Sequence, residues 1–195
     1  HSASRAVDLY DAKADVEAVL AAIGAPAKVQ ILREGAAWWH PGRHGRICLG
    51  PKKTLGVFGE LHPKVLKQMG IKGAAVAFTI FPDEVPLPRK SGATRPALAI
   101  SDLQAVERDF AFVVDADVEA LALVNAAAGA DKALIEDVRV FDEFIGGSLG
   151  EGKKSLAITV RLQPSDKTLK EKDIEAVSEK IIAKVAKATG GTLRG

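Results

Sequence analysis

The sequence predicts an α+β protein whose C-terminal hundred residues form one β-α-β-β-α-β unit. Three observations support this fold class. Apolar residues recur at every second position in three runs after residue 105, as in half-buried strands. Two further segments, one after the first run and one after the third, have apolar residues at helical spacing. A Gly-Gly pair then introduces a short last strand over residues 192–195.

The first strand and the first helix of the unit follow directly from this spacing. The strand is predicted over Val106–Val114, where large apolar residues alternate with smaller or polar ones. A helix is expected over Asp115–Ala128, because Asp115 is a suitable N-cap and acidic residues occupy the first turn. Gly129 is expected to end it. The residues expected to face the core are Val118, Leu121 and Val124.

A β-hairpin and a second helix complete the unit. The hairpin strands are expected over Leu134–Phe144 and Lys154–Gln163, and the glycine-rich segment IGGSLGEG reverses the chain between them. In the following helix, Thr168 and Glu171 have the spacing of a capping box, and Gly190-Gly191 is expected to close it. Its apolar stripe consists of Ile174, Val177, Ile181, Ile182 and Val185.

Such a unit has a ferredoxin-like arrangement, in which two helices cover one face of a four-stranded antiparallel sheet and leave the other face open. Alternation in the third strand points four apolar residues toward the helices: Leu156, Ile158, Val160 and Leu162. The residues expected on the open face from this strand are Ser155, Ala157, Thr159, Arg161 and Gln163. With Val138, Val140 and Leu193 inward, the same rule points Arg139, Phe141 and Arg194 outward.

The open face has the residue types of an RNA-binding surface. Aromatic rings stack on unpaired bases, and guanidinium groups bind phosphates or base edges. The candidate RNA contacts are Arg139, Phe141, Arg161 and Arg194 on the sheet, with Lys153 and Lys154 at the end of the glycine-rich loop. Solvated arginines beside an edge aromatic are the commoner explanation of such a pattern alone.

The charge balance favours a local RNA contact over a generally basic surface. Residues 1–90 carry 13 Lys+Arg against 8 Asp+Glu, whereas residues 91–195 carry 14 against 17. Since phosphate attraction follows local positive charge, RNA contact in the C-terminal part must depend on a few cations.

Residues 1–90 are predicted to form a first α+β domain and residues 91–195 the second. Proline, glycine and small polar residues concentrate in Phe81–Arg95, as in a linker. In the first domain, helices are expected over Asp11–Ile23 and from about Pro63. Strands are expected over Ala27–Glu34, Arg46–Leu49, Leu55–Glu60 and Ala75–Phe81.

The sequence contains no convincing catalytic or metal constellation. The possible metal ligands are His40, His44, Cys48 and His62, but Pro41-Gly42 separates the first two histidines and no second cysteine completes a tetrahedral set. The segment GEGKKS lacks the spacing of a phosphate-binding loop and joins strand to strand. We therefore expect no catalytic residue, metal or cofactor in this chain.

Two further features concern the compartment. A single cysteine excludes an internal disulfide framework and suits the cytosol. The chain also lacks an apolar run of about 18 residues, so no membrane insertion is expected.

Several segments together resemble a known family. They are YDAKADVEAVL (residues 10–20), HPGRHGRI (40–47), GVFGELHPKVL (56–66), ERDFAFVV (107–114), GKKSLAITVRLQPSDKTL (152–169) and the terminal GGTLRG. In this order they resemble the C-terminal part of the β subunit of bacterial phenylalanine–tRNA ligase. The resemblance implies that residues from about 95 onward form a ferredoxin-fold anticodon-binding domain for phenylalanine tRNA. It implies that the first ninety residues are part of a class II synthetase-like module without catalytic residues.

The resemblance also implies which subunits the chain assembles with and which of them catalyses the reaction. In this family the α subunit of an α2β2 enzyme activates phenylalanine with ATP and Mg²⁺. The chain is therefore expected to bind tRNA, and to pack with the α subunit and the remainder of the β subunit in the cytoplasm, without catalysing a reaction itself. A half-module should expose apolar surface or sheet edges that its missing part would cover. Pro41, Gly42, Gly59 and Pro63 are expected to fix backbone geometry.

Two alternatives stay open at this point. Family members often have paired arginines where this chain has Glu107-Arg108, so Arg108 either contacts RNA or, as we favour, pairs with a neighbouring carboxylate. Ferredoxin-like units also serve as small-molecule regulatory modules, which is the alternative function for this chain.

Overall fold

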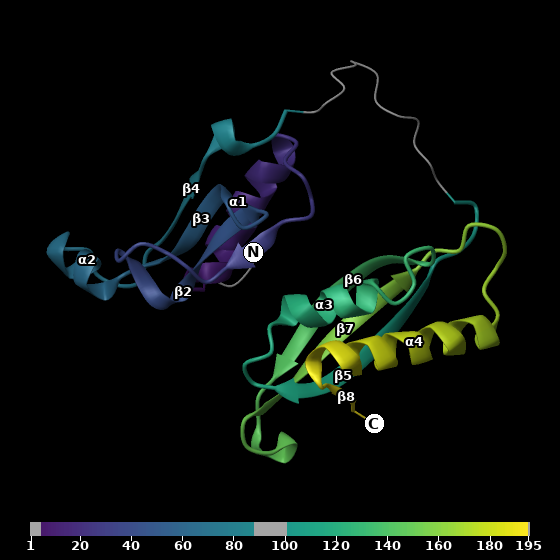
Figure 1. Cartoon of the computed structure of the whole chain (residues 1–195). Coiled ribbons are helices and arrows are strands. Elements are labelled where there is room, and N and C mark those ends of the chain that lie inside the picture. The colour runs from purple at the N-terminus through teal and green to yellow at the C-terminus, as the bar shows by residue number, and fades with distance from the viewer. Residues whose placement is uncertain (1–4, 88–100, 195) are drawn as a thin grey trace. The chain divides into compact units, whose positions relative to one another are not determined.

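The computed structural model describes residues 5–87 and 101–194 of the chain (Figure 1). The chain divides into two compact units, His1–Arg95 and Pro96–Gly195. The boundary predicted near residue 90 lies outside the described residues, as does most of the predicted linker. The described beginning of that linker contains a single 3-10 turn, η1 (Pro82–Glu84).

The first unit is a four-stranded antiparallel sheet covered by one long helix. Its sheet has the order β1-β2-β3-β4. In chain order the elements are α1 (Leu9–Ala22), β1 (Gln30–Leu32), β2 (Trp39–Leu49), β3 (Lys53–Leu61), α2 (Pro63–Gln68) and β4 (Val76–Ile80). The helix α1 lies across one face of the sheet in Figure 1 and buries Ala12, Val16 and Leu20 there. The sheet residues buried in the same core are Ile47, Leu55 and Phe58.

Most element predictions for this unit are confirmed in type and adjusted in length. Helix α1 and strands β3 and β4 lie close to the predicted ranges. The first predicted strand shrinks to three residues. Strand β2 instead extends back through His40–Gly45, with an irregular register between Trp39 and His44. Pro41 lies in this irregular stretch, where a residue without an N–H costs no ladder hydrogen bond.

Gly59 allows strands β2 and β3 to approach closely. A Cβ built at Gly59 would lie 2.5 Å from the Cβ of His44 and 2.8 Å from the carbonyl oxygen of Arg43. The expectation that Gly59 fixes backbone geometry is thus confirmed. Gly42 has nothing within 4 Å of such a Cβ and no left-handed φ, so the structure shows no steric need for glycine there. Pro63 takes the first position of α2, where its missing N–H is harmless.

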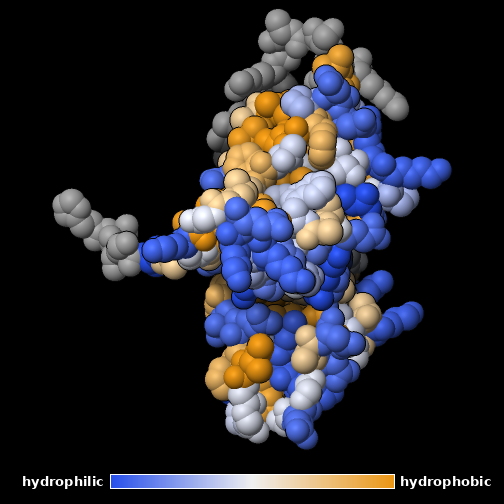
Figure 2. Space-filling model, turned by 90° about the vertical axis from the view of Figure 1, so that its left-hand side faces the viewer, coloured by the Kyte–Doolittle hydropathy of each residue, from blue (hydrophilic) through white to orange (hydrophobic). Residues whose placement is uncertain are grey.

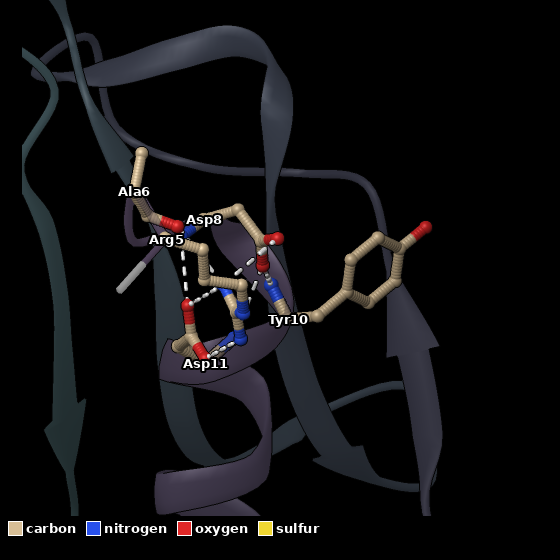
Figure 3. A network of polar contacts seen from close by, with 5 residues as sticks. All are labelled: Arg5, Ala6, Asp8, Tyr10 and Asp11. Carbon is tan, nitrogen blue, oxygen red and sulfur yellow. Dashed lines mark hydrogen bonds and ion pairs between the residues drawn. The ribbon is translucent and has the colours of Figure 1, made fainter. Parts of the chain in front are cut away.

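A network of polar contacts caps the start of α1 (Figure 3). The Asp8 carboxylate accepts from the Tyr10 N–H at 2.8 Å, and the Asp11 carboxylate accepts from the Asp8 N–H at 2.8 Å, which together form a capping box. Arg5 donates to the carboxylate of Asp11. The hydrogen bond from Arg5 lowers the pKa of the Asp11 carboxyl. The ionised Asp11 carboxylate therefore stabilises the fold at neutral pH, and this stabilisation is lost as the pH falls through the lowered pKa.

The second unit has the predicted β-α-β-β-α-β order. In chain order the elements are β5 (Val106–Asp115), α3 (Ala120–Ala128), β6 (Ile135–Phe144), η2 (Gly147–Leu149), β7 (Lys153–Leu162), α4 (Glu171–Thr189) and β8 (Thr192–Leu193). All pairings are antiparallel in the order β6-β7-β5-β8. Figure 1 shows α3 and α4 on the same face of this sheet. The strand residues packed beneath them include Phe110, Phe112, Leu156, Ile158, Val160 and Leu162.

The start and the phase of helix α3 were predicted wrongly. The helix begins at Ala120, because Asp115 is still part of β5 and is paired with Lys153. A turn, with the Val118 N–H donating to the carbonyl of Asp115, precedes the helix. This delay changes the buried face: Leu123 and Ala127 are fully buried, whereas Leu121 is 38% exposed. Gly129 ends the helix as predicted.

The cap of α4 also differs from the prediction, while the stripe is confirmed. The backbone N–H of Lys170 donates to the Asp173 carboxylate at 3.0 Å, so the capping interaction lies two residues beyond the predicted Thr168 and Glu171 pair. Gly190 closes the helix with a left-handed φ of 68°. The buried stripe residues are Ile174, Val177, Ile181 and Val185, with Ile182 packed beside them.

Exposed apolar residues are numerous in the first unit. Its β1 and β4 are the edges of the sheet. The large apolar residues exposed there are Val7, Tyr10, Val19, Ile23, Trp38, Met69, Ile71, Phe78, Phe81 and Leu87. Figure 2 shows hydrophobic side chains gathered among hydrophilic ones on the face turned to the viewer. Within the described segments, no helix has the length and apolar character needed to cross a membrane.

The close approach at Gly59 predicts a specific cost. Gly59→Ala should lower the free energy of unfolding of the first unit by about 1–3 kcal/mol, because the new methyl group meets the backbone of β2. Both tryptophans of the chain, Trp38 and Trp39, lie in this unit, so tryptophan fluorescence during urea unfolding reports on it. Gly42→Ala is the matched control and should change the value by less than about 0.5 kcal/mol. Equal stability of the two variants would contradict the steric argument.

The cap of α1 predicts a second difference. Asp8→Ala removes an acceptor for the first-turn N–H groups and should destabilise the first unit by about 1 kcal/mol. Asp8→Asn retains an acceptor oxygen and should stay within a few tenths of a kcal/mol of the parent chain. The same fluorescence-monitored unfolding measures both. If Asn destabilised as much as Ala, the charge of Asp8 and not its hydrogen bonds would be the stabilising element.

Candidate nucleic-acid interface

The face of the second sheet opposite α3 and α4 is called the open face below. Strand register assigns alternate residues of each strand to it. Strand β5 contributes Glu107, Asp109, Ala111, Val113 and Asp115; β7 contributes Lys153, Ser155, Ala157, Thr159 and Arg161; β6 contributes Asp137, Arg139, Asp142 and Phe144. The backbone N–H of Arg194 donates to the carbonyl of Ala111, which continues the β8 pairing to this residue.

The structure brings Arg139 and Arg161 together at one end of the open face. Both guanidinium groups contact the same oxygen, Oε1 of Glu107, at 3.4 Å from Arg139 and 3.5 Å from Arg161. Arg161 also donates to Glu136 at 2.7 Å, and Arg139 lies 3.2 Å from Asp137. The two predicted arginines therefore form one cluster with three carboxylates. The prediction that they lie on the open face is confirmed.

Arg161 is charged at any physiological pH, and the neighbouring carboxylates stabilise this form further. Its hydrogen bond to Glu136, more than its contact with Glu107, raises the pKa of the Arg161 guanidinium above its ordinary value. The side chain is 42% exposed, so an incoming ligand can reach it. A guanidinium that is charged, exposed and held in place by carboxylates beside it is suited to contact phosphates or base edges.

A second cluster, of an aromatic ring and an arginine, lies at the other end of the open face. The guanidinium carbon of Arg194 is 5.8 Å from the centroid of the Phe144 ring, within the range of a cation–π contact. Small residues, Ala111 and Ala157, occupy the next row of the sheet. Ser155, the cross-strand partner of Phe144, lies on the open face as predicted, but it is only 4% exposed and offers little surface to a ligand.

Phe144 and Glu136 are the site residues that alternation missed. Strand β6 has a register shift between Ile135 and Asp137 and another between Val140 and Asp142. Each shift inserts one extra residue, and the second places Phe144 on the open face, whereas unbroken alternation from Val138 and Val140 would place it on the helix side. Phe141, the predicted aromatic contact, lies within the second shift and is 58% exposed.

The two candidate lysines are separated by the sheet. Lys153 belongs to the open face and donates to Asp115 at 2.6 Å. Lys154 is the register partner of Val114, on the helix side, where it pairs with Glu143 at 3.2 Å and its side chain is 11% exposed. They therefore do not form one phosphate-binding pair.

Arg108 lies on the helix side of β5 as the partner of Val160. Its guanidinium is 3.7 Å from the carboxylate of Glu171 at the start of α4. This agrees with the favoured structural pairing of Arg108 with a carboxylate.

The four possible metal ligands of the first unit make separate contacts. His44 Nδ1 lies 2.7 Å from the carbonyl oxygen of His40, His62 caps α2 by accepting from the Lys64 N–H, and Cys48 is buried as a free thiol. Across residues 5–87 and 101–194, no group of three or more His, Cys, Asp or Glu residues is arranged to hold a metal ion.

A hollow of about 390 Å³ lies between α3 and α4 on the helix side. Its lining consists of Asn125, Ala126, Gly129, Lys184, Lys187 and Ala188. A small-molecule regulatory module, the alternative function, needs a ligand site, and this open groove is a candidate for one. The comparisons below support an anticodon-binding domain family over that alternative.

Comparison with known proteins identifies both units. Residues 101–194 match the family "Ferredoxin-fold anticodon binding domain", and residues 1–81 match "Phenylalanyl tRNA synthetase beta chain CLM domain". The chain is 85% identical over 195 residues to the phenylalanine–tRNA ligase β subunit of Ruegeria pomeroyi, covering 100% of this chain and 24% of that protein. It is 69% identical over 195 residues to the β subunit of Cereibacter sphaeroides and 53% identical over 191 residues to that of Brucella abortus.

These two matches cover 98% and 97% of this chain and 24% of each relative. The chain thus spans about a quarter of the length of the relatives it matches. The matched domains occur in the order that the sequence predicted, and the ferredoxin-fold match covers the unit that contains the open face. The chain belongs to the family of phenylalanine–tRNA ligase β subunits.

Proposed function

We propose that the open face binds the anticodon region of phenylalanine tRNA. The arginine cluster contacts phosphates or base edges, and the Phe144–Arg194 pair offers a stacking surface for an unpaired base. The observation that carries this proposal is the combination of exposed guanidinium and aromatic groups on the uncovered sheet of an anticodon-binding domain. Of the predicted contacts, Arg139, Arg161 and Arg194 keep this role, and Phe144 joins Phe141 as an aromatic candidate.

The peripheral candidates have smaller roles in this proposal. Lys153 is exposed on the open face and can exchange Asp115 for a phosphate oxygen. Lys154 is largely covered on the helix side and would reach a phosphate only by breaking its ion pair with Glu143.

We propose further that the chain serves assembly and not chemistry. Residues 1–90 would be part of a class II synthetase-like module without catalytic function, and residues 91–195 the tRNA-binding domain. The exposed apolar residues of the first unit would contact the remainder of the β subunit and the α subunit of an α2β2 enzyme. ATP and Mg²⁺ would act in the α subunit, and the assembly would lie in the cytoplasm.

Binding of RNA by the open face is tested by single arginine substitutions. Arg161→Ala should weaken the binding of phenylalanine tRNA to the whole chain roughly ten-fold, because one exposed charged donor is lost. Arg139→Ala should act in the same direction. Arg108→Ala is the matched control, since it removes the same charge from the helix side of the same strand pair. Fluorescence anisotropy with labelled tRNA measures all three. If Arg108→Ala weakened tRNA binding as much as Arg161→Ala, the net charge of the chain, and not the open face, would determine the affinity.

Assembly without catalysis predicts a negative result in an exchange assay. The chain alone, given phenylalanine, ATP and Mg²⁺, should not exchange pyrophosphate into ATP above a blank without protein. A complete phenylalanine–tRNA ligase serves as the positive control under the same conditions. Pyrophosphate exchange that rises in proportion to the concentration of the purified chain would contradict the proposal.

A further inference from the structure

The carboxylate of Glu107 occupies the position that bridges two guanidinium groups. Its Oε1 atom lies 3.4 Å from a terminal nitrogen of Arg139 and 3.5 Å from one of Arg161. Glu136 and Asp137 contact the outer sides of the same arginines. Three carboxylates and two guanidiniums thus alternate in one row, so the cluster as a whole carries excess negative charge.

An RNA phosphate would bind at the same position, between Arg139 and Arg161. Phosphate oxygens accept paired hydrogen bonds from guanidinium groups, and a site between two arginines offers donors from both to one anion. Because Glu107 already fills it, a phosphate must displace this carboxylate. The displaced carboxylate remains attached to β5, close to the ligand and repelling it.

The rest of the open face strengthens this effect. Asp109 accepts a hydrogen bond from Thr159 at 2.6 Å, next to the arginine cluster. Within the described part of the chain, six carboxylates lie on or contact this face against four cations. The carboxylates are Glu107, Asp109, Asp115, Glu136, Asp137 and Asp142, and the cations are Arg139, Lys153, Arg161 and Arg194. A ligand that offers only phosphate groups therefore gains little binding free energy on this face.

We propose that Glu107 is a specificity-determining residue, an internal carboxylate that competes with RNA phosphates for Arg139 and Arg161. RNA that offers only phosphates benefits little from displacing it. RNA that also stacks on the Phe144 end and presents matching base edges makes enough favourable interactions to stay bound. This inference deepens the proposed function and rests on it.

Glu107→Gln is the informative substitution, with Glu171→Gln as its control. Glutamine keeps the shape of the side chain and an oxygen that accepts from both arginines, so the fold should be unchanged. Glu171 is the carboxylate that pairs with Arg108 on the helix side, and its replacement changes the net charge of the same unit equally. Binding of the whole chain to phenylalanine tRNA and to a non-cognate tRNA is measured across a salt series.

Glu107→Gln should tighten binding to both RNAs several-fold, with the larger increase in affinity for the non-cognate tRNA, so that discrimination falls. The dependence of log affinity on log salt should steepen by about 0.7 for each additional phosphate that the arginines neutralise. Glu171→Gln should leave discrimination and the salt dependence unchanged.

The outcomes separate this inference from the proposed function. If Arg161→Ala weakens binding but Glu107→Gln behaves like Glu171→Gln, Glu107 does not compete with phosphate and only this inference fails. An equal increase in affinity for both tRNAs, with discrimination intact, would overturn its role in specificity. If the parent chain and all variants fail to bind tRNA, or if Arg161→Ala binds like the parent, the proposed function fails and this inference with it.

Discussion

The alternation of strand β7 between the helix layer and the open face is the constraint on which the second unit depends. Its four inward residues, Leu156 to Leu162 at every second position, are at most 1% exposed. A shift of one residue would move Arg161 into this apolar layer and place leucines and valines in water. Burying an unpaired charge costs far more than any local rearrangement can regain, so the register is tightly specified. The outward direction of the open-face residues of β7, and of their partners in β5, follows from it.

The same register explains why this sheet is not a general cation surface. Acidic residues of β5 and β6 fall beside the arginines of β6 and β7 because neighbouring strands present opposite charges in one row. Such pairs are exposed and stabilise the fold only weakly. Their greater effect is on ligands, since a compensated arginine attracts distant anions less than a free one. Affinity must then come from interactions made at close range.

Sequence reasoning predicted the regular parts of the second unit and missed its irregular ones. Strict alternation in β5 and β7, and the stripe of α4 from Ile174 to Val185, were sufficient to predict the sheet, its covered face and the outward direction of Arg161. Strand β6 is different, because a bulge depends on how its partner strand hydrogen-bonds and has no strong local signal. That is why Phe144 was missed as a site residue. The late start of α3 has a similar cause, since pairing with Lys153 keeps Asp115 in the sheet despite its suitability as a cap.

The shared oxygen of Glu107 makes the two arginines thermodynamically dependent on each other. When one guanidinium is removed, the Glu107 carboxylate keeps the other as its ion-pair partner. Changes at Arg139 and Arg161 are therefore not additive, and the effect of either depends on which residue stands at position 107. A replacement of Glu107 therefore alters the surroundings of two cations at once, whereas a replacement of either arginine alters one ion pair and leaves the other in place.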